Sequence, residues 1–391
     1  MKIALRYFTL AIGLLLAFSV QAQKELHPQY ESISPGLDYA HIRMTNWNDG
    51  EPQSIHVARM ERGQKDLHLA SGLAHNEVFR TAPVSVIAKE IPASIGQSLA
   101  AINTGFCINV QTPYYGGPRG LVITEGEVIS EPSKYSFWLN EDGEMNCGQV
   151  EANFTAILPG GRTVPIGLNR QCNPDEVVLF THRLGSSTRA TNNLELILED
   201  AEGAALFWRA SQKYSFRVKG LNPGGNTALS NNVAILSFGS DVSAELGEFA
   251  PGDKVVLDLA TIPSLHKVRT ACQTIFPIVR HGELVTEFDT RDYLKQRHPR
   301  TAIGFNARHF YMVVVDGRKP GISTGMLPDE LGQLMVLLGC TEAMNMDGGG
   351  STTFWSDGHV RNSVAGSRER DRSDALVVVK RSPDELSGGG R

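Results

Sequence analysis

The chain has 391 residues and a formal net charge of −5 at pH 7, with 42 acidic residues against 37 basic ones. This acidic balance argues against general nucleic-acid binding, because a phosphate backbone requires a basic face. The length allows one large domain or two ordinary ones. The 39 glycines and 41% hydrophobic residues favour a globular chain of many short strands and turns over a helical bundle.

The first 22 residues have the pattern of a secretory signal peptide. Lys2 and Arg6 give a basic start, residues 8–20 are almost wholly apolar, and residues 20–22 resemble a cleavage site. The apolar run is too short for a membrane-spanning helix, which needs about 20 residues. We therefore expect an exported protein, periplasmic or secreted, that is not inserted in a membrane. Loss of this segment removes two basic residues and makes the remaining chain more acidic.

The rest of the chain predicts mainly strands. Alternating polar and apolar residues predict a half-buried strand over 54–60, residues 84–91 favour a helix, and 120–218 predict strands and hairpins. In the last third, a β-branched run predicts a strand over 310–315. A proline start and an apolar stripe predict a helix over 328–338, and a further strand follows over 342–346. We expect an α+β fold, namely one large β-rich domain over 23–381 with mixed sheets and a few packed helices, and a flexible tail over 382–391.

The five cysteines are an odd number for an exported protein, so at least one thiol stays free or pairs between chains. Cys147 and Cys172 flank one β-like segment and are the best candidates for a disulfide. No CxxC spacing occurs, so neither a zinc site nor a redox site is indicated.

A polar glycine loop follows the last predicted strand. Glycine accepts positive φ and lets a ligand approach the backbone. Exposed backbone N–H groups in such a loop can bind an anion. The acid at its start then suits sugar hydroxyls, a cation or the orientation of a neighbour; the alternative is a tight turn in which the acid caps amides. The loop comprises Asp347, Gly348, Gly349, Gly350, Ser351 and Thr352.

Two familiar glycine motifs do not fit this loop. A phosphate-binding P-loop has Lys after its last glycine, where this chain has Ser351. A nucleophile elbow has the pattern G-x-S-x-G, and Thr353 occupies the place of its last glycine. A nucleophilic Ser351 is therefore not expected.

Two further segments contain candidate ligand-binding residues. Arg300 and Thr301 precede an apolar strand, and Arg is well suited to a two-pronged contact with phosphate or carboxylate; a structural ion pair is the alternative. Asn103 lies beside a glycine and Arg119 follows shortly after, a pattern that suits a sugar hydroxyl but also an ordinary turn. His298 precedes a proline, where a surface or core role is more common than a catalytic one.

Together these segments resemble the phosphodiester glycosidase family. The resemblance runs over about 34–381. Its most specific strings are PRTAIG at 299–304, VDGR at 315–318 and NMDGGGST at 345–352, supported by INTGF at 102–106 and PRGL at 118–121. The sequence departs from the family pattern at Thr104, at Cys107, at 273–277 where a glycine-rich stretch is usual, and at Leu327 where a hydroxyl often caps the helix.

This resemblance implies hydrolysis of a sugar-1-phosphodiester, of the N-acetylglucosamine type, at its glycosidic C–O bond. Asp347 would be the carboxylate that activates water or stabilises an oxocarbenium-like centre, with Asp316 as second choice. Arg300 and the loop amides would stabilise the departing phosphate. Substrate-binding roles would fall to Asn103, Arg119, Thr301, Asn345, Gly348, Gly349, Gly350, Ser351 and Thr352.

No cofactor is required by this reaction. An Asp and Asn oxygen set would suit a hard divalent cation such as Ca²⁺, although no loop has a recognised calcium spacing. The partner expected is a carbohydrate phosphodiester; the sugar, the stereochemical outcome and the oligomeric state stay open. Two other functions also stay open: a glycosidase acting on phosphate-free exported or cell-surface polysaccharide, and a non-catalytic carbohydrate-binding protein.

Overall fold

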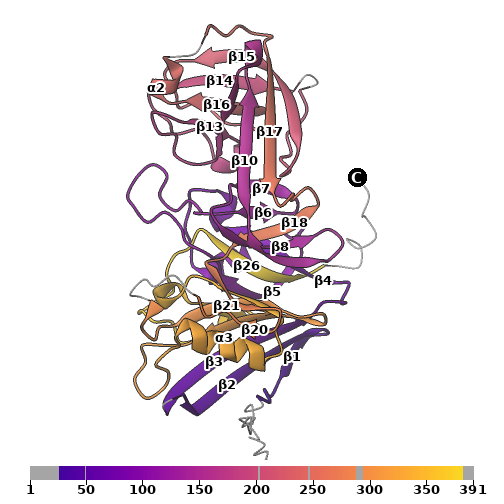
Figure 1. Ribbon diagram of the computed structural model, residues 1–391, viewed down its shortest axis with the longest axis vertical. Coiled ribbons are helices and arrows are strands. Elements are labelled where there is room, and N and C mark those ends of the chain that lie inside the picture. Colours follow the sequence, from indigo (N-terminus) through magenta and orange to yellow (C-terminus); the bar gives the residue numbers. More distant parts are fainter. Residues whose placement is uncertain (1–25, 49, 201–202, 245–246, 288–293, 382–391) are drawn as a thin grey trace, which may run out of the picture.

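The computed structural model describes residues 26–381 apart from 49, 201–202, 245–246 and 288–293 (Figure 1). The predicted signal peptide over 1–22 and tail over 382–391 lie outside the described residues. Within the described ranges, no helix has both the length and the apolar character needed to cross a membrane.

The described residues form four sheets, two with eight strands and two with five. The first sheet has the order β1 (Glu31–Ser34), β2 (Leu37–Trp47), β3 (Glu51–Glu61), β22 (His309–Val315), β21 (Arg300–Phe305), β23 (Glu342–Asn345), β19 (Phe276–Arg280) and β20 (Glu283–Leu284). The fourth sheet has the order β25 (His359–Val360), β24 (Phe354–Ser356), β5 (Gln97–Asn103), β26 (Asp374–Lys380) and β4 (Leu67–Leu73).

The second and third sheets complete the fold. The second has the order β11 (Thr163–Pro165), β10 (Glu151–Ile157), β17 (Lys254–Ile262), β15 (Lys213–Asn222), β14 (Leu194–Glu199), β16 (Val233–Phe238), β13 (Val177–Phe180) and β12 (Gly167–Leu168). The third has the order β7 (Glu127–Ser130), β6 (Val122–Thr124), β18 (Val268–Gln273), β8 (Tyr135–Asn140) and β9 (Met145–Gln149). The second sheet is thus built from one continuous segment, 151–262, and lies at one end of an elongated molecule (Figure 1).

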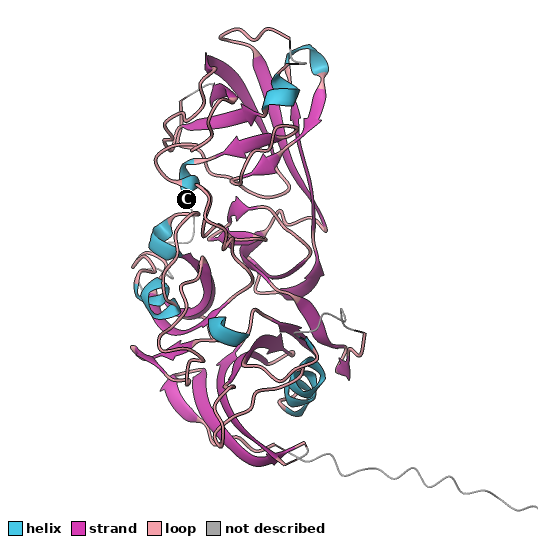
Figure 2. Cartoon of the chain, turned by 90° about the vertical axis from the view of Figure 1, so that its left-hand side faces the viewer, coloured by secondary structure: helices cyan, strands magenta, loops and turns pink. Residues whose placement is uncertain are grey.

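Helices are short and lie at the sides of the sheets (Figure 2). The α-helices are α1 (Val84–Lys89), α2 (Ser240–Ser243) and α3 (Pro328–Leu337), and the 3₁₀ turns described are η1 (Ala74–Asn76), η2 (Pro159–Gly161), η3 (His182–Leu184) and η5 (Gly349–Ser351). Helix α3 begins at the predicted proline, and its buried stripe packs on the first sheet. Leu327 has no hydroxyl, but its N–H donates to the Glu330 carboxylate at 2.8 Å, so the helix start is still capped.

The first, third and fourth sheets share one core. Ile303 and Met312 of the first sheet, Ile102 of the fourth and Phe137 of the third belong to a single buried cluster. Burial of several large side chains at about 1.5–3 kcal/mol each holds the three sheets in fixed positions. This rigidity matters because the candidate site lies where strands of the first and fourth sheets end.

The β-rich expectation with few packed helices is confirmed. The strands at 51–61, 309–315 and 342–345 and the helices at 84–89 and 328–337 lie where the sequence predicts them. The expected mixed sheets contain little parallel pairing. Among the described strands, β12 and β13 pair in parallel and the other strand pairs are antiparallel. A single domain over 23–381 stays a prediction.

The predicted Cys147–Cys172 disulfide is wrong, because all five cysteines are free thiols. Cys147 lies on β9 of the third sheet opposite Phe137. Cys172 follows β12 of the second sheet, and its thiol donates to the carbonyls of Glu176 and Ser237. Between the two cysteines the chain leaves the third sheet and passes through β10, β11 and β12 of the second.

Candidate active site

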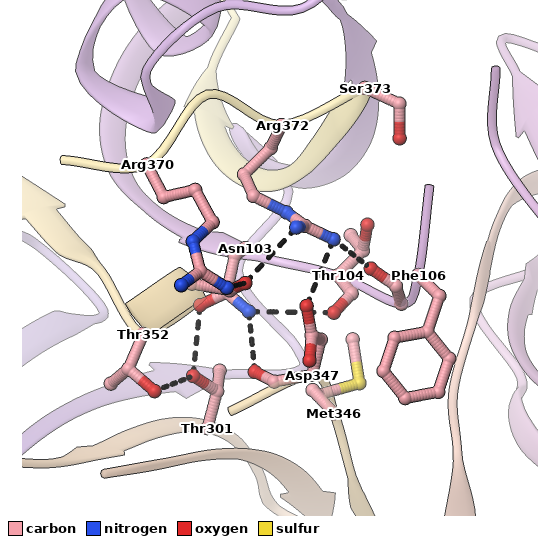
Figure 3. Close-up of polar contacts among 12 residues, drawn as sticks. Asn103, Thr104, Phe106, Thr301, Met346, Asp347, Thr352, Arg370, Arg372 and Ser373 are labelled. Atoms are coloured by element: carbon pink, nitrogen blue, oxygen red, sulfur yellow. Dashed lines mark hydrogen bonds and ion pairs between the residues drawn. The ribbon is translucent and has the colours of Figure 1, made fainter. Parts of the chain in front are cut away.

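The glycine loop connects two sheets. It leaves β23 of the first sheet after Asn345 and enters β24 of the fourth sheet at Phe354. Asn103, the last residue of β5, holds this crossing from within the core (Figure 3). Its Nδ2 donates to the Asp347 carbonyl at 2.6 Å, and its Oδ1 accepts from Thr301 Oγ1 at 2.8 Å and from the Thr353 N–H at 3.1 Å. The buried Asn103 amide therefore fixes the loop, rather than facing the cavity described below.

The loop glycines are required by close backbone contacts. A Cβ at Gly348 would lie 2.7 Å from the Pro299 carbonyl oxygen. Gly349 takes φ +65° and donates its N–H to the same carbonyl at 2.8 Å. Positive φ is costly for most other residues, so the DGGG string sets the path of the backbone against β21.

Arg372 is a central cation of this region that the sequence did not reveal. Its Nη2 lies 3.0 Å from the Asp347 carboxylate, a contact in which both side chains are largely buried. The same guanidinium donates to Ser351 Oγ at 3.0 Å and to the Gly105 carbonyl at 2.6 Å (Figure 3). Because the planar guanidinium presents several N–H donors, Arg372 orients the Asp347 carboxylate and links the glycine loop to the end of β5.

Burial raises the pKa of Asp347 above that of an ordinary aspartate, and the positive charge of Arg372 opposes part of this rise. Ser351, Arg370 and the Gly348 N–H act in the same direction as Arg372. Desolvation is the dominant cause. A carboxylate with a raised pKa beside a cavity is a frequent property of catalytic acids and bases.

Asp347 lines a cavity of about 380 Å³. The cavity is rich in cations: Arg119 and Arg318 are exposed there, and Arg300 is buried in its wall. Its complete lining is Phe106, Arg119, Ile275, His298, Arg300, Arg318, Asn345, Met346, Asp347, Gly348 and Gly349. One carboxylate among three guanidinium groups makes this a cavity suited to an anionic ligand.

The three arginines are held differently. Arg300 donates from Nε to the Met326 carbonyl at 2.8 Å and from Nη2 to the Gln296 carbonyl at 3.1 Å. Arg318 takes φ 59° and lies with Nη2 3.4 Å from His298 Nδ1. Arg119 is anchored through its backbone N–H, which donates to the Phe106 carbonyl at 2.9 Å. Arg300 therefore also holds the surrounding loops, whereas the exposed Arg119 and Arg318 side chains are better placed to meet a ligand.

Burial lowers the pKa of His298, and the positive charges of Arg318 and Arg300 lower it further. A neutral imidazole is therefore favoured at this position. Asn345 supplies a second neutral group: its Nδ2 donates to the Met346 carbonyl at 2.8 Å, and its buried Oδ1 has no hydrogen-bond partner among the described residues. A ligand hydroxyl would satisfy that acceptor.

Asp316 does not line this cavity. Its carboxylate is buried, accepts from Ser54 Oγ at 2.9 Å and from the Ser363 N–H at 2.9 Å, and lies 3.3 Å from His56 Nε2. It also lies 3.3 Å from Asn362 Nδ2, and Asn362 contacts the Thr352 carbonyl. Asp316 therefore supports the loop from behind, and the structure does not bring it together with Asp347.

The structure divides the predicted site residues into two groups. Those that line the cavity are Arg119, Arg300, Asn345, Asp347, Gly348 and Gly349. Those behind it or beside it are Asn103, Thr301, Asp316, Gly350, Ser351 and Thr352, of which Thr301 bonds Asn103 and Ser351 bonds Arg372. Their roles in catalysis and binding stay predictions.

Sequence reasoning did not assign Arg318, Phe106, Arg370 or Arg372 to the site, and it favoured a surface or core role for His298. Arg318 is part of the VDGR string, and His298 directly precedes PRTAIG, so their places beside specific motifs were a usable signal. Arg370 and Arg372 alternate with acids over 368–372, a pattern that resembles an ordinary solvated surface. Among the described residues, no group of three or more His, Cys, Asp or Glu could hold a metal ion, and the role of Ca²⁺ stays an untested expectation.

Comparison with known proteins supports the resemblance drawn from the motifs. Residues 211–379 match the model of the phosphodiester glycosidase family. This stretch contains PRTAIG, VDGR, NMDGGGST and Arg372, and it is shorter than the range over which the motifs resemble the family. No curated protein sequence matches the chain.

Two solved structures share the fold at low identity, and a third aligns more weakly. A hypothetical protein from Synechocystis superposes with a TM-score of 0.71 at 18% identity, over 92% of this chain and 64% of that one, so the chain spans less than two thirds of its length. A candidate exported protein from Burkholderia pseudomallei gives 0.66 at 18% identity, over 84% of this chain and 74% of that one. The catalytic domain of zebrafish N-acetylglucosamine-1-phosphodiester alpha-N-acetylglucosaminidase gives 0.48 at 14% identity, over 91% of this chain and 88% of that one.

Proposed function

From the match of residues 211–379 to the phosphodiester glycosidase family, we propose that this chain is an exported hydrolase of sugar-1-phosphodiesters of the N-acetylglucosamine type. Water adds to the anomeric carbon and the bond from that carbon to the phosphate oxygen breaks. The products are the free sugar and a phosphomonoester that retains all of its original oxygens. Export is proposed from the leader-like residues 1–22 and from the description of the Burkholderia structure.

One observation carries the proposal: among the described residues, a single largely buried carboxylate borders a cavity that also contains three guanidinium groups. A phosphodiester is anionic, and its charge grows on the departing oxygen as the glycosidic bond breaks. Fixed cations stabilise that charge at little reorganisation cost. Arg119 and Arg318 would contact the phosphate, and the backbone of the glycine loop would lie beside it.

Asp347 would act on the sugar side. In its ionised form it either accepts a proton from the attacking water or stabilises the positive charge that develops on the anomeric carbon. Arg372 holds the carboxylate at 3.0 Å and favours its ionised form. A phosphate leaving group needs less protonation than an ordinary alcohol, so this one carboxylate with surrounding cations suits the reaction.

The acid limb of the pH profile follows from the pKa of Asp347. Because burial raises that pKa and the ionised form is the active one, kcat/KM falls on acidification through a value above about 3.9, the ordinary aspartate pKa. The raised pKa favours the protonated side chain in the folded state, so protonation of Asp347 does not itself unfold the protein. The measurement is kcat/KM from pH 3 to 8 with circular dichroism at each pH. A limb at or below the ordinary value, with the fold intact, contradicts the assignment.

Arg119→Ala is expected to lower kcat/KM on a sugar-1-phosphodiester by about tenfold, the order of one hydrogen bond to a charged group. Turnover of an aryl glycoside, which has no phosphate, should change much less. Arg217→Ala, an exposed arginine on β15 in the second sheet, is the matched control and should change neither. Equal losses by Arg119→Ala on both substrates would place Arg119 outside phosphate recognition.

One assay separates the three candidate functions. Purified protein is offered a sugar-1-phosphodiester and the aryl glycoside of the same sugar. Release of sugar only from the phosphodiester supports the proposal, whereas release only from the aryl glycoside supports a polysaccharide glycosidase. Binding of either compound without any release supports a non-catalytic carbohydrate-binding protein.

A further inference from the structure

A second cavity adjoins the candidate active site. It has a volume of about 710 Å³ and shares one wall residue, Ile275, with the cavity that contains Asp347. The Ile275 N–H donates to the Asn345 carbonyl at 2.9 Å, and Phe276 of the second cavity pairs with Asn345 in the sheet. The wall between the two cavities is therefore fixed to a residue that lines the active site.

The volume of the second cavity decides what size of group could occupy it. At about 710 Å³ it exceeds the 380 Å³ of the active-site cavity. Cavities of about 300–1,000 Å³ typically hold ligands the size of a drug molecule. A substrate whose phosphate carries only a small alcohol would leave this space to water.

The side chains around the second cavity suit a carbohydrate that carries negative charge. Lys134 and Arg280 are both exposed there, and neither has an ion-pair partner among the described residues. Tyr135 is half-buried, its hydroxyl accepts a hydrogen bond from Gln149 Nε2 at 3.2 Å, and Lys134 Nζ lies 5.2 Å from the centroid of its ring. Among the described residues, one carboxylate, Glu287, also borders the cavity, against the two cations Lys134 and Arg280.

We propose that this second cavity is an acceptor groove, defined by Lys134, Tyr135, Gln149, Ile275 and Arg280, that binds the alcohol side of the scissile phosphodiester. The occupant is an extended carbohydrate that carries a further phosphate beyond the one at Asp347. This inference rests on the proposed function and adds to it the substrate class: a phosphate-containing glycan chain rather than a small sugar phosphodiester. Lys134 and Arg280 meet the added phosphate, and the Tyr135 hydroxyl and the Gln149 amide hydrogen-bond sugar hydroxyls.

Three probes with the same sugar-1-phosphate test the groove. The first is its methyl diester, the second its diester to a neutral second sugar, and the third its diester to a second sugar that carries a phosphate monoester. Wild-type kcat/KM should rise from the first probe to the third. In Lys134→Ala/Arg280→Ala, the ratio of kcat/KM for the third probe to that for the second should fall about fivefold, the order of two exposed ion pairs.

The matched control is Lys213→Ala/Arg217→Ala, which removes one exposed lysine and one exposed arginine from β15 of the second sheet. This control should keep the wild-type ratio. Added salt should reduce the wild-type preference for the third probe, because exposed charges are screened. Equal kcat/KM for all three probes, or a ratio unchanged by the groove variant, overturns the inference and leaves the proposed function standing.

Absence of cleavage of every probe overturns the proposed function instead. Titration calorimetry of the third probe then tests the groove directly. Weaker binding by the groove variant than by wild type supports the acceptor groove, and equal dissociation constants for the two proteins overturn it.

Discussion

Asp347→Asn is expected to lower kcat on a sugar-1-phosphodiester by about a thousandfold, within the range typical of a lost general acid or base. Asn keeps the shape of the side chain and can still accept a hydrogen bond from Arg372, which lies 3.0 Å from the carboxylate. The amide cannot accept a proton from water or carry the negative charge that stabilises an oxocarbenium-like centre. The measurement is steady-state kinetics, with circular dichroism to confirm the fold.

Two comparison variants make this result specific. Asp357→Asn changes an exposed carboxylate on the turn between β24 and β25 and should retain wild-type kcat. Asp316→Asn alters the buried carboxylate behind the loop and should act mainly on stability, since its contacts are internal. If Asp316→Asn abolished turnover in a folded protein while Asp347→Asn did not, the result would contradict the assignment of Asp347 and identify Asp316 as the catalytic carboxylate.

Arg372→Met is expected to have the largest effect on stability. It removes the partner of a buried carboxylate and the donor to Ser351 Oγ and to the Gly105 carbonyl. Breaking a buried ion pair by removing one partner costs about 3–5 kcal/mol, because the remaining charge is left unpaired. Urea unfolding at pH 7 measures the loss in free energy of unfolding.

The same substitution should also shift the pH profile. Arg372 is the main group that opposes the rise in the pKa of Asp347, so its removal raises that pKa further. The acid limb of kcat/KM then moves to higher pH, whereas loss of a merely structural contact would lower kcat/KM at all pH values alike. Arg372→Lys retains the positive charge without the planar set of N–H donors, so it should shift the acid limb of kcat/KM less than Arg372→Met does. An unshifted limb in both variants contradicts the electrostatic role of Arg372.

The parts of the fold that were predictable depend on local pattern. The β-branched run of β22 and the proline start and apolar stripe of α3 each specify an element without reference to distant residues. The position of Asp347 just past the end of β23, which ends at Asn345, likewise follows from sequence neighbours, and the structure places it at a cavity.

The parts that were not predictable depend on pairing between distant strands. Arg372 reaches Asp347 because β26 pairs with β5, which sets Ala375 opposite Asn103 at the end of both strands. Asp316 and Asp347 both follow β-strands in sequence, yet one carboxylate turns into a buried network with His56 and the other borders a cavity. Residue type and spacing do not distinguish these two outcomes, because the difference is made by which sheet packs against each strand end.

The position of the broken bond is tested most directly by hydrolysis of a sugar-1-phosphodiester in water enriched in ¹⁸O. Cleavage between the anomeric carbon and the phosphate oxygen adds the oxygen of water to the sugar. The phosphomonoester should therefore contain no ¹⁸O when it is analysed by mass spectrometry. A phosphomonoester that carries one ¹⁸O would show attack at phosphorus and would contradict a glycosidase acting through Asp347.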